Sequence, residues 1–173
     1  AGLTAFLSTC TEKGQKNAES SERPNIVFIL ADDLGWADVG YYGNAIETPN
    51  LDELARTGIR LDQQYVMPTS TPTRVGLITG RYPSRYGVTG PAYGEVIDLG
   101  TPTLASLLSE EGYYTSISGK WHMGSPPEYT PLEYGFQSSY GYFDGQIDPY
   151  THNYKMKTEL TDRKSWHRND QYL

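Results

Sequence analysis

Three short polar clusters carry the side chains that could do chemistry. The first is the pair Asp32 and Asp33, which directly follows an apolar run. Carboxylate oxygens are the ligands that Ca²⁺ and Mg²⁺ prefer in proteins. Because successive side chains of a strand point to opposite faces, both carboxylates can bind one cation only if the chain leaves extended geometry there. The alternative interpretation of this pair is a solvated turn.

The second cluster, Ser70 to Arg74 (STPTR), combines a small hydroxyl nucleophile with a cation one helical turn later. At the start of a helix, free backbone N–H groups and the helix dipole stabilise negative charge. Arg74 would then hold Ser70 and an oxyanion that forms beside it. An ordinary helix cap is the alternative, but the continuation from Gly76 to Arg81 makes the pattern more specific.

The third cluster, residues 119–124 (GKWHMG), places Lys120 and His122 two residues apart between glycines. An ammonium group and an imidazole at this spacing can neutralise and protonate an anionic group. The flanking glycines let backbone and substrate approach closely. The alternative is a surface loop with a packed Trp121.

The elements that must position these clusters alternate between strands and helices. Strands are predicted at residues 25–30, 59–66 and 113–118, and helices at 48–58, 69–80 and 101–111. The first strand is a near-continuous apolar run, which predicts burial on both faces. Asn50 and Glu53 have the spacing of a capping box, and Leu104, Leu107 and Leu108 are expected to face inward. The pattern predicts an α/β fold with a mostly parallel sheet flanked by helices, whose ligands bind at the carboxyl ends of strands.

Composition excludes several classes of function. Among the 173 residues, 14 Lys and Arg stand against 21 Asp and Glu, a net charge of −7. An acidic chain of this kind is a poor candidate for binding nucleic acid. No apolar run approaches the roughly 18 residues of a membrane-spanning helix, so no transmembrane segment is predicted. The single Cys excludes an intrachain disulfide framework and a thiolate metal cluster.

Residues 1–22 are interpreted as the remnant of an export leader followed by a flexible tether, and residues 23–173 as the folded part. The sequence from Leu7 to Cys10 is similar to the end of a bacterial lipoprotein signal, although Thr9 departs from its usual small residue. Cys10 is therefore a candidate for a lipid anchor, and a free Cys in a leader is the alternative. We expect a protein that is periplasmic, anchored to the outer membrane or secreted.

The three clusters, in this order, resemble the type I sulfatases of the alkaline-phosphatase superfamily. The matching stretches are residues 24–35, 48–52, 70–81 and 112–124, and Tyr134–Phe136, Tyr140–Gly141 and Tyr150–His152 are similar to the arylsulfatase B-like branch. The resemblance covers Arg23 to about Asp170. It implies an incomplete alkaline-phosphatase-like sulfatase fold, the N-terminal part of a longer catalytic domain.

The resemblance also implies a modified nucleophile at Ser70. In the family a Cys or Ser is oxidised to formylglycine (3-oxoalanine) by a maturation enzyme, and one hydroxyl of the hydrated aldehyde attacks the sulfur of a sulfate ester. The second hydroxyl then expels sulfate, which a plain Ser cannot do. By the same resemblance, Asp32, Asp33 and the modified Ser70 ligate Ca²⁺.

Three further roles follow from the resemblance. Arg74 would stabilise the formylglycine hydrate, Lys120 would bind sulfate oxygens, and His122 would contact the diol or help to release sulfate. Thr73 stands where the family more often has Ser, and Ser70 indicates either a Ser-type maturation system or an engineered replacement of Cys. The family's later His, Asp-Asn pair and Lys have no counterpart here, so the chain alone is expected to turn over little.

Sulfuric ester hydrolysis, acting on a sulfated glycan or an aryl sulfate, is the leading hypothesis. One alternative is a phosphoryl-transfer relative that uses unmodified Ser70. Another is a truncated sugar-binding module without turnover, in which the Tyr-rich segment from Tyr134 to Tyr154 stacks on sugar rings. Loop packing is the simpler interpretation of that segment.

Overall fold

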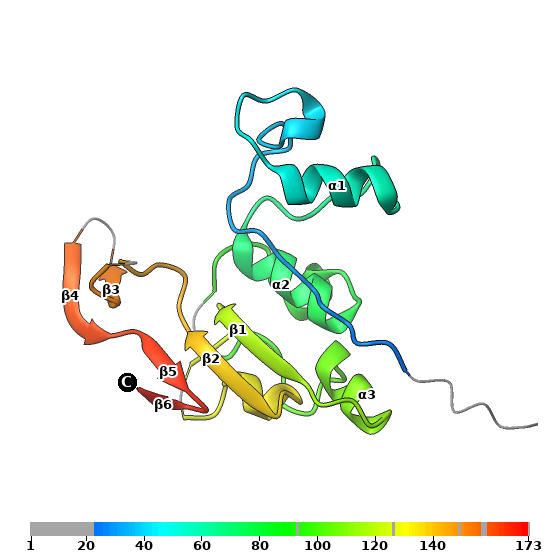
Figure 1. Cartoon of the computed structure of the whole chain (residues 1–173). Helices are drawn as coiled ribbons and strands as arrows, with labels where there is room; N and C mark the ends of the chain where they lie inside the picture. The colour runs from blue at the N-terminus through cyan, green and yellow to red at the C-terminus, as the bar shows by residue number, and fades with distance from the viewer. Residues whose placement is uncertain (1–22, 93, 126, 149, 157–158, 173) are drawn as a thin grey trace, which may run out of the picture. The chain divides into compact units, whose positions relative to one another are not determined.

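A computed structural model describes residues 23–92, 94–125, 127–148, 150–156 and 159–172 (Figure 1). The chain divides into two compact units, Ala1–Gly35 and Trp36–Leu173, and each is described by itself. The leader, the tether and the lipid-anchor candidate Cys10 were predicted within residues 1–22, which lie outside the described residues.

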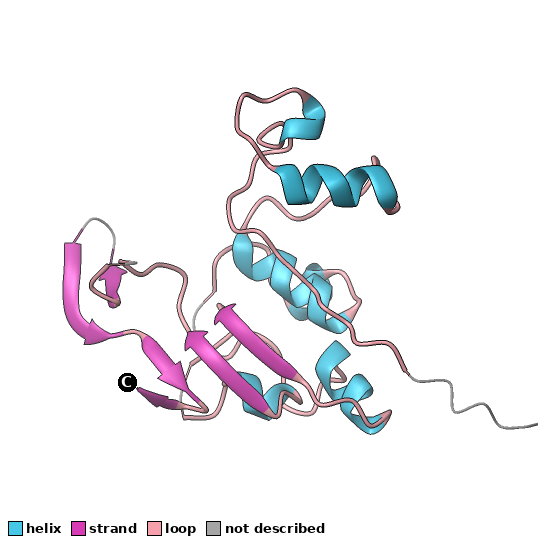
Figure 2. Cartoon of the chain, in the orientation of Figure 1, coloured by secondary structure: helices cyan, strands magenta, loops and turns pink. Residues whose placement is uncertain are grey.

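The described part of the first unit contains no helix or strand and is drawn as loop in Figure 2. The prediction of a buried strand at residues 25–30 is wrong for this structure, since Val27 is 82% and Ile29 79% exposed. The chain leaves extended geometry at the two carboxylates, which is the condition for both of them to bind one cation. Asp33 has a φ of 57°, in the left-handed region, and residues 32–33 form a bend.

Helix α1 (Pro49–Thr57) follows the 3₁₀ turn η1 (Gly40–Tyr42) and confirms the helix predicted at 48–58. Its N-cap is Thr48, so Asn50 lies inside the helix and forms no capping box. The Thr48 hydroxyl donates to Asp52 Oδ1 at 2.8 Å, and the N–H of Gly58 donates to the Leu54 carbonyl at 2.8 Å and ends the helix.

The strand predicted at residues 59–66 does not form. Ile59 is 91% exposed and Tyr65 76%, and residues 62–63 form a turn. A strand is stable only when its backbone pairs with a neighbour, and no described residue supplies that neighbour.

Helix α2 (Ser70–Thr79) confirms the prediction at 69–80. It begins after Thr69 and ends at Gly80, whose φ of 64° suits a residue without a side chain. The helix buries Val75 and Ile78. The 3₁₀ turn η2 (Pro83–Tyr86) follows it.

Helix α3 (Leu104–Glu110) confirms the helix predicted at 101–111, but its orientation differs from the prediction. Thr103 and Ser106 form a capping box, and the Thr103 hydroxyl also donates to the Tyr134 carbonyl at 2.6 Å. This hydrogen bond fixes the helix so that Ala105 faces the core, while Leu104 is 42% and Leu107 52% exposed.

The sheet of the second unit is small and mixed, which confirms the α/β class with one parallel pair. Its order is β1-β2-β5-β6, and β1 pairs with β2 in parallel while the other pairs are antiparallel. Its strands are β1 (Ser116–Lys120), β2 (Ser138–Tyr142), β5 (Trp166–Arg168) and β6 (Gln171–Tyr172). Strands β3 (Asn153–Met156) and β4 (Glu159–Lys164) form a separate hairpin, and the 3₁₀ turn η3 (Pro131–Tyr134) precedes β2.

The core lies against one face of this sheet. Its buried side chains are Val75, Ile78, Val88, Val96, Ile97, Trp121, Met123, Tyr134 and Phe143. Because α2 contributes two of them and Ile117 of β1 packs against them, the helix is fixed to the sheet.

Two glycines determine how closely β1 and β2 approach. Gly119 and Gly141 are paired in register, and a Cβ atom at position 141 would clash with the Gly119 carbonyl oxygen. Figure 1 shows the two strands side by side. Among the described residues, no helix has the length and apolar character needed to cross a membrane.

Candidate active site

The structure brings three of the predicted site residues together at the start of α2. Ser70 is the first residue of the helix, and Arg74 Nε donates to Ser70 Oγ at 3.0 Å. Arg74 Nη1 also donates to the carbonyl oxygen of Lys120 at 2.8 Å. One guanidinium group therefore connects the candidate nucleophile to the carboxyl end of β1.

Local contacts explain why α2 begins at Ser70. Thr69 is extended, with φ −134° and ψ 161°. The Thr73 hydroxyl donates to the carbonyls of Thr69 and Met67, at 2.9 and 3.0 Å. A Ser at position 73 would have the same hydroxyl group. The hydroxyl of Thr73 thus fixes the backbone that leads into the helix. Ser70 is only partly buried and lies at the helix end where backbone N–H groups favour an anion.

Lys120 is the last residue of β1, and the three residues after it are all buried. Trp121 and Met123 are buried in the core, 1% and 0% exposed, whereas Lys120 is only partly buried. The Trp121 indole donates to the Tyr129 carbonyl at 3.0 Å. The packed Trp of the alternative interpretation is therefore present, and the packing fixes the backbone that carries Lys120.

His122 is buried, 7% exposed, and has a φ of 54°. Its backbone N–H donates to the Phe143 carbonyl at 2.7 Å. A Cβ atom at position 145 would lie only 2.6 Å from His122 Nε2, so Gly145 leaves the space that the imidazole occupies. Sequence reasoning missed Gly145, because a glycine within a stretch rich in Gly and Tyr gives no local signal of such a contact.

A second buried imidazole belongs to His167 on β5. Its ring stacks on Phe143 with centroids 3.7 Å apart and an interplanar angle of 9°. Burial lowers the pKa of His167 to about 4, and the Gly141 carbonyl acts weakly in the opposite direction. His167 is therefore neutral at pH 7 and packs as an aromatic side chain.

Asp32 and Asp33 lie in the first unit and Ser70 in the second, so the metal set of Asp32, Asp33 and Ser70 stays a prediction. The bend at Asp33 and the two hard oxygen donors fit a divalent cation such as Ca²⁺. They would fill only part of its shell of about six to eight oxygens. No three His, Cys, Asp or Glu side chains gather as metal ligands within the described residues.

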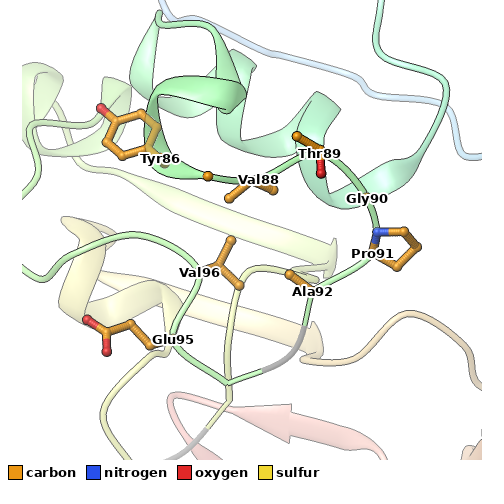
Figure 3. A pocket seen from close by; sticks show the side chains of 9 residues that line it. Tyr86, Val88, Thr89, Gly90, Pro91, Ala92, Glu95 and Val96 are labelled. Carbon is orange, nitrogen blue, oxygen red and sulfur yellow. The ribbon is translucent and has the colours of Figure 1, made fainter.

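A cavity of about 340 Å³ lies beside the first turn of α2 (Figure 3). It is lined by residues 86–92 together with Glu95 and Val96, and Val88 and Val96 face each other in Figure 3. The Ala92 N–H donates to the Thr71 hydroxyl at 3.4 Å, which connects the cavity wall to the residue after Ser70. None of the predicted catalytic residues lines the cavity.

Comparisons with known proteins find matches along most of the chain. The family model described as Sulfatase matches residues 24–170. An N-acetylgalactosamine-6-O-sulfatase of Bacteroides thetaiotaomicron is 45% identical over 130 residues, covering 72% of this chain and 25% of that protein. The chain thus spans about a quarter of the length of this curated relative.

The chain is also similar to solved structures. The crystal structure of Ps i-CgsB superposes with a TM-score of 0.74 and 32% identity, covering 88% of this chain and 37% of that chain. Ps i-CgsB in complex with k-i-k-neocarrahexaose superposes with a TM-score of 0.67 and 33% identity, covering 82% and 35%.

Proposed function

Because the chain belongs to the sulfatase family, we propose that the protein hydrolyses sulfate esters with residue 70 as its nucleophile. The observation that carries the proposal is the pair of hydrogen bonds from Arg74 to Ser70 Oγ and to the Lys120 carbonyl. They connect a nucleophile and a fixed cation on α2 with the Lys120–His122 cluster, which begins 46 residues after Arg74.

The chemistry at position 70 depends on its side chain. As formylglycine, made from Ser70 by a maturation enzyme, the residue would supply a hydrated aldehyde with one hydroxyl for attack and another for release. Arg74 Nε would hold the oxygen of residue 70 as it holds Ser70 Oγ, and the N-terminus of α2 would favour negative charge beside it.

Lys120 and His122 would act on the transferring group. The Lys120 ammonium would bind sulfate oxygens, and its backbone is already fixed through the Arg74 contact. His122 would hold or move a proton at an oxygen of residue 70. Asp32 and Asp33 would hold Ca²⁺, which would supply positive charge to the reaction.

We propose a sulfated glycan as the substrate class, with small aryl sulfates as surrogates. The proposal is supported by two similar proteins, of which one is named an N-acetylgalactosamine-6-O-sulfatase and the other has been solved with k-i-k-neocarrahexaose. Export to the periplasm, the outer membrane or the medium, with a lipid anchor at Cys10, remains part of the proposal.

The first experiment measures the mass of the peptide that contains residue 70, together with hydrolysis of 4-nitrophenyl sulfate by the full-length protein. We expect a peptide lighter than the Ser form by two hydrogens and release of 4-nitrophenol. An unmodified Ser70 with phosphatase activity would instead support phosphoryl transfer. Sugar binding without turnover of any ester would support the binding-module alternative.

A variant tests the carrying observation directly. Arg74→Lys keeps the charge but loses the planar group that reaches both oxygens, so kcat/KM for 4-nitrophenyl sulfate should fall by about 10²–10³. Arg56→Lys is the matched control, because Arg56 pairs with Glu53 on the exposed surface of α1. Equal activity in the two variants would contradict the proposed role of Arg74.

A further inference from the structure

Gly145 lies directly against the imidazole of His122. A Cβ atom at position 145 would lie 2.6 Å from both Cε1 and Nε2 of that ring and 3.3 Å from Nδ1. These three ring atoms are the nearest heavy atoms that such a Cβ would meet beyond its own chain neighbours. Carbon atoms in van der Waals contact are about 3.5–4.0 Å apart. The imidazole therefore occupies its present position only while residue 145 has no side chain.

The backbone conformation at position 145 does not itself require a glycine. Gly119 and Gly124 have φ values of 110° and 134°, which residues with a side chain rarely adopt. Gly145 is not among the described glycines that have a positive φ. An alanine at this position would keep the backbone without that strain, so the contact with the His122 ring is the feature that requires a glycine.

The backbone of His122 is held in place on both sides. Its N–H donates to the Phe143 carbonyl at 2.7 Å. Its neighbours Trp121 and Met123 are 1% and 0% exposed, and His122 itself is 7% exposed. A methyl group at position 145 would therefore be accommodated by rotation of the imidazole about its χ angles, and this rotation would carry the ring nitrogens away from their present positions.

Residues 143–145 thus determine both the backbone and the ring position of His122. Phe143 is 0% exposed, and its ring stacks on His167 with centroids 3.7 Å apart. The carbonyl that accepts from the His122 N–H consequently has a fixed place in the core. Two residues later, Gly145 limits where the imidazole can lie.

We propose that Gly145 is a positioning residue, which keeps the His122 imidazole in the orientation in which it acts on residue 70. This inference rests on the proposed function, since it assumes that His122 holds or moves a proton there. Gly145 acts through the imidazole alone and touches no reacting atom. Because a displacement of about 1 Å in a reacting group can lower a rate by roughly 10²-fold, the absence of one methyl group has a measurable consequence.

The first test substitutes the glycine in the full-length protein. For Gly145→Ala we expect kcat for 4-nitrophenyl sulfate to fall by about 10²-fold with little change in KM, because a proton transfer and not substrate binding is affected. Gly90→Ala is the matched control. Gly90 lies in the cavity wall (Figure 3), has no positive φ, and a Cβ there would meet no heavy atom within 4 Å. Equal kcat values in the two variants would overturn the inference.

A double-mutant cycle tests whether Gly145 acts through His122. His122→Ala removes all three atoms that a Cβ at position 145 would meet, so Gly145→Ala should cause no further loss of kcat in that background. A loss as large as in the wild-type background would overturn the inference. If Gly145→Ala alone does not fold, the double variant should fold, and its failure to fold would also overturn the inference.

The NMR signal of the His122 Cε1–H group gives a readout that does not depend on turnover. The signal is assigned by its disappearance in His122→Ala. We expect it to shift in Gly145→Ala and to stay unchanged in Gly90→Ala, and an unshifted signal in Gly145→Ala would contradict the inference. If the wild type does not hydrolyse 4-nitrophenyl sulfate while the signal shifts, the proposed function fails and the positioning of the imidazole by Gly145 stands.

Discussion

The region around Trp121 and the segments at residues 25–30 and 59–66 carry similar apolar side chains in very different environments. Trp121, Met123 and Phe143 are 0–1% exposed. Val27, Ile29 and Ile59 are 79–91% exposed. The difference lies in backbone pairing, since within the described residues the region around Trp121 has a paired strand and the two exposed segments have none.

Those partners are present around Trp121. The N–H groups of Trp121 and His122 donate to the carbonyls of Tyr142 and Phe143, at 2.9 and 2.7 Å, so the segment continues the β1–β2 pairing beyond the last strand residue. The other two segments have no strand pairing in the described residues. The candidate active site is accordingly built where the backbone pairs with a neighbouring strand.

The largest effect should come from Trp121→Ala. Removing a buried Trp should lower the free energy of unfolding by about 3–5 kcal/mol, measured by urea denaturation. The matched control is Trp36→Ala, since Trp36 is 72% exposed and stacks on Tyr42. If Trp36→Ala lowered the free energy of unfolding as much as Trp121→Ala, the expected contrast between buried and exposed apolar side chains would be contradicted.

The next effect concerns pH. His167 has a folded pKa of about 4 against an ordinary value of 6.5, so the unfolded chain binds the proton more tightly. The free energy of unfolding therefore loses nothing to His167 above pH 6.5. It falls by about 3 kcal/mol in total as the pH drops toward 4. The measurement is urea denaturation at pH 7, 5.5 and 4.

His167→Phe should reduce that decline, because its ring cannot be protonated, whereas exposed His152→Phe should preserve it. Burial raises the pKa of Asp170, so that carboxyl works in the opposite direction and is present in both variants. An identical decline in wild type and His167→Phe would show that another group causes it.

The smallest effect is expected in an exposed segment. Ile59→Ala should change the free energy of unfolding by no more than about 0.5 kcal/mol, as for most surface substitutions. Ile97→Ala, at a position that is 2% exposed, should cost about 2–5 kcal/mol. A cost of several kcal/mol at Ile59 would mean that this side chain has a buried partner.

Local signals account for what could be predicted from the sequence. Helices α1, α2 and α3 were predicted because caps, prolines and terminal glycines act within a few residues. The contact between Ser70 and Arg74 follows from helix geometry, since residues four apart lie on one face.

Non-local pairing explains the rest. The contact between Arg74 and Lys120 spans 46 residues, and no spacing rule predicts it. Strands β2 and β5 escaped prediction because their sequences are rich in Tyr, Gly and polar residues. The apolar runs at 25–30 and 59–66 have the residue pattern of strands, but this pattern does not identify a neighbouring strand with which they could pair.

Gly141 has a consequence for interpreting gene variants of this protein. Any side chain there would push β2 away from the Gly119 carbonyl, and the Phe143 carbonyl that holds the His122 backbone would move with it. A substitution at this position should therefore displace the backbone of His122 while leaving each candidate catalytic side chain chemically intact.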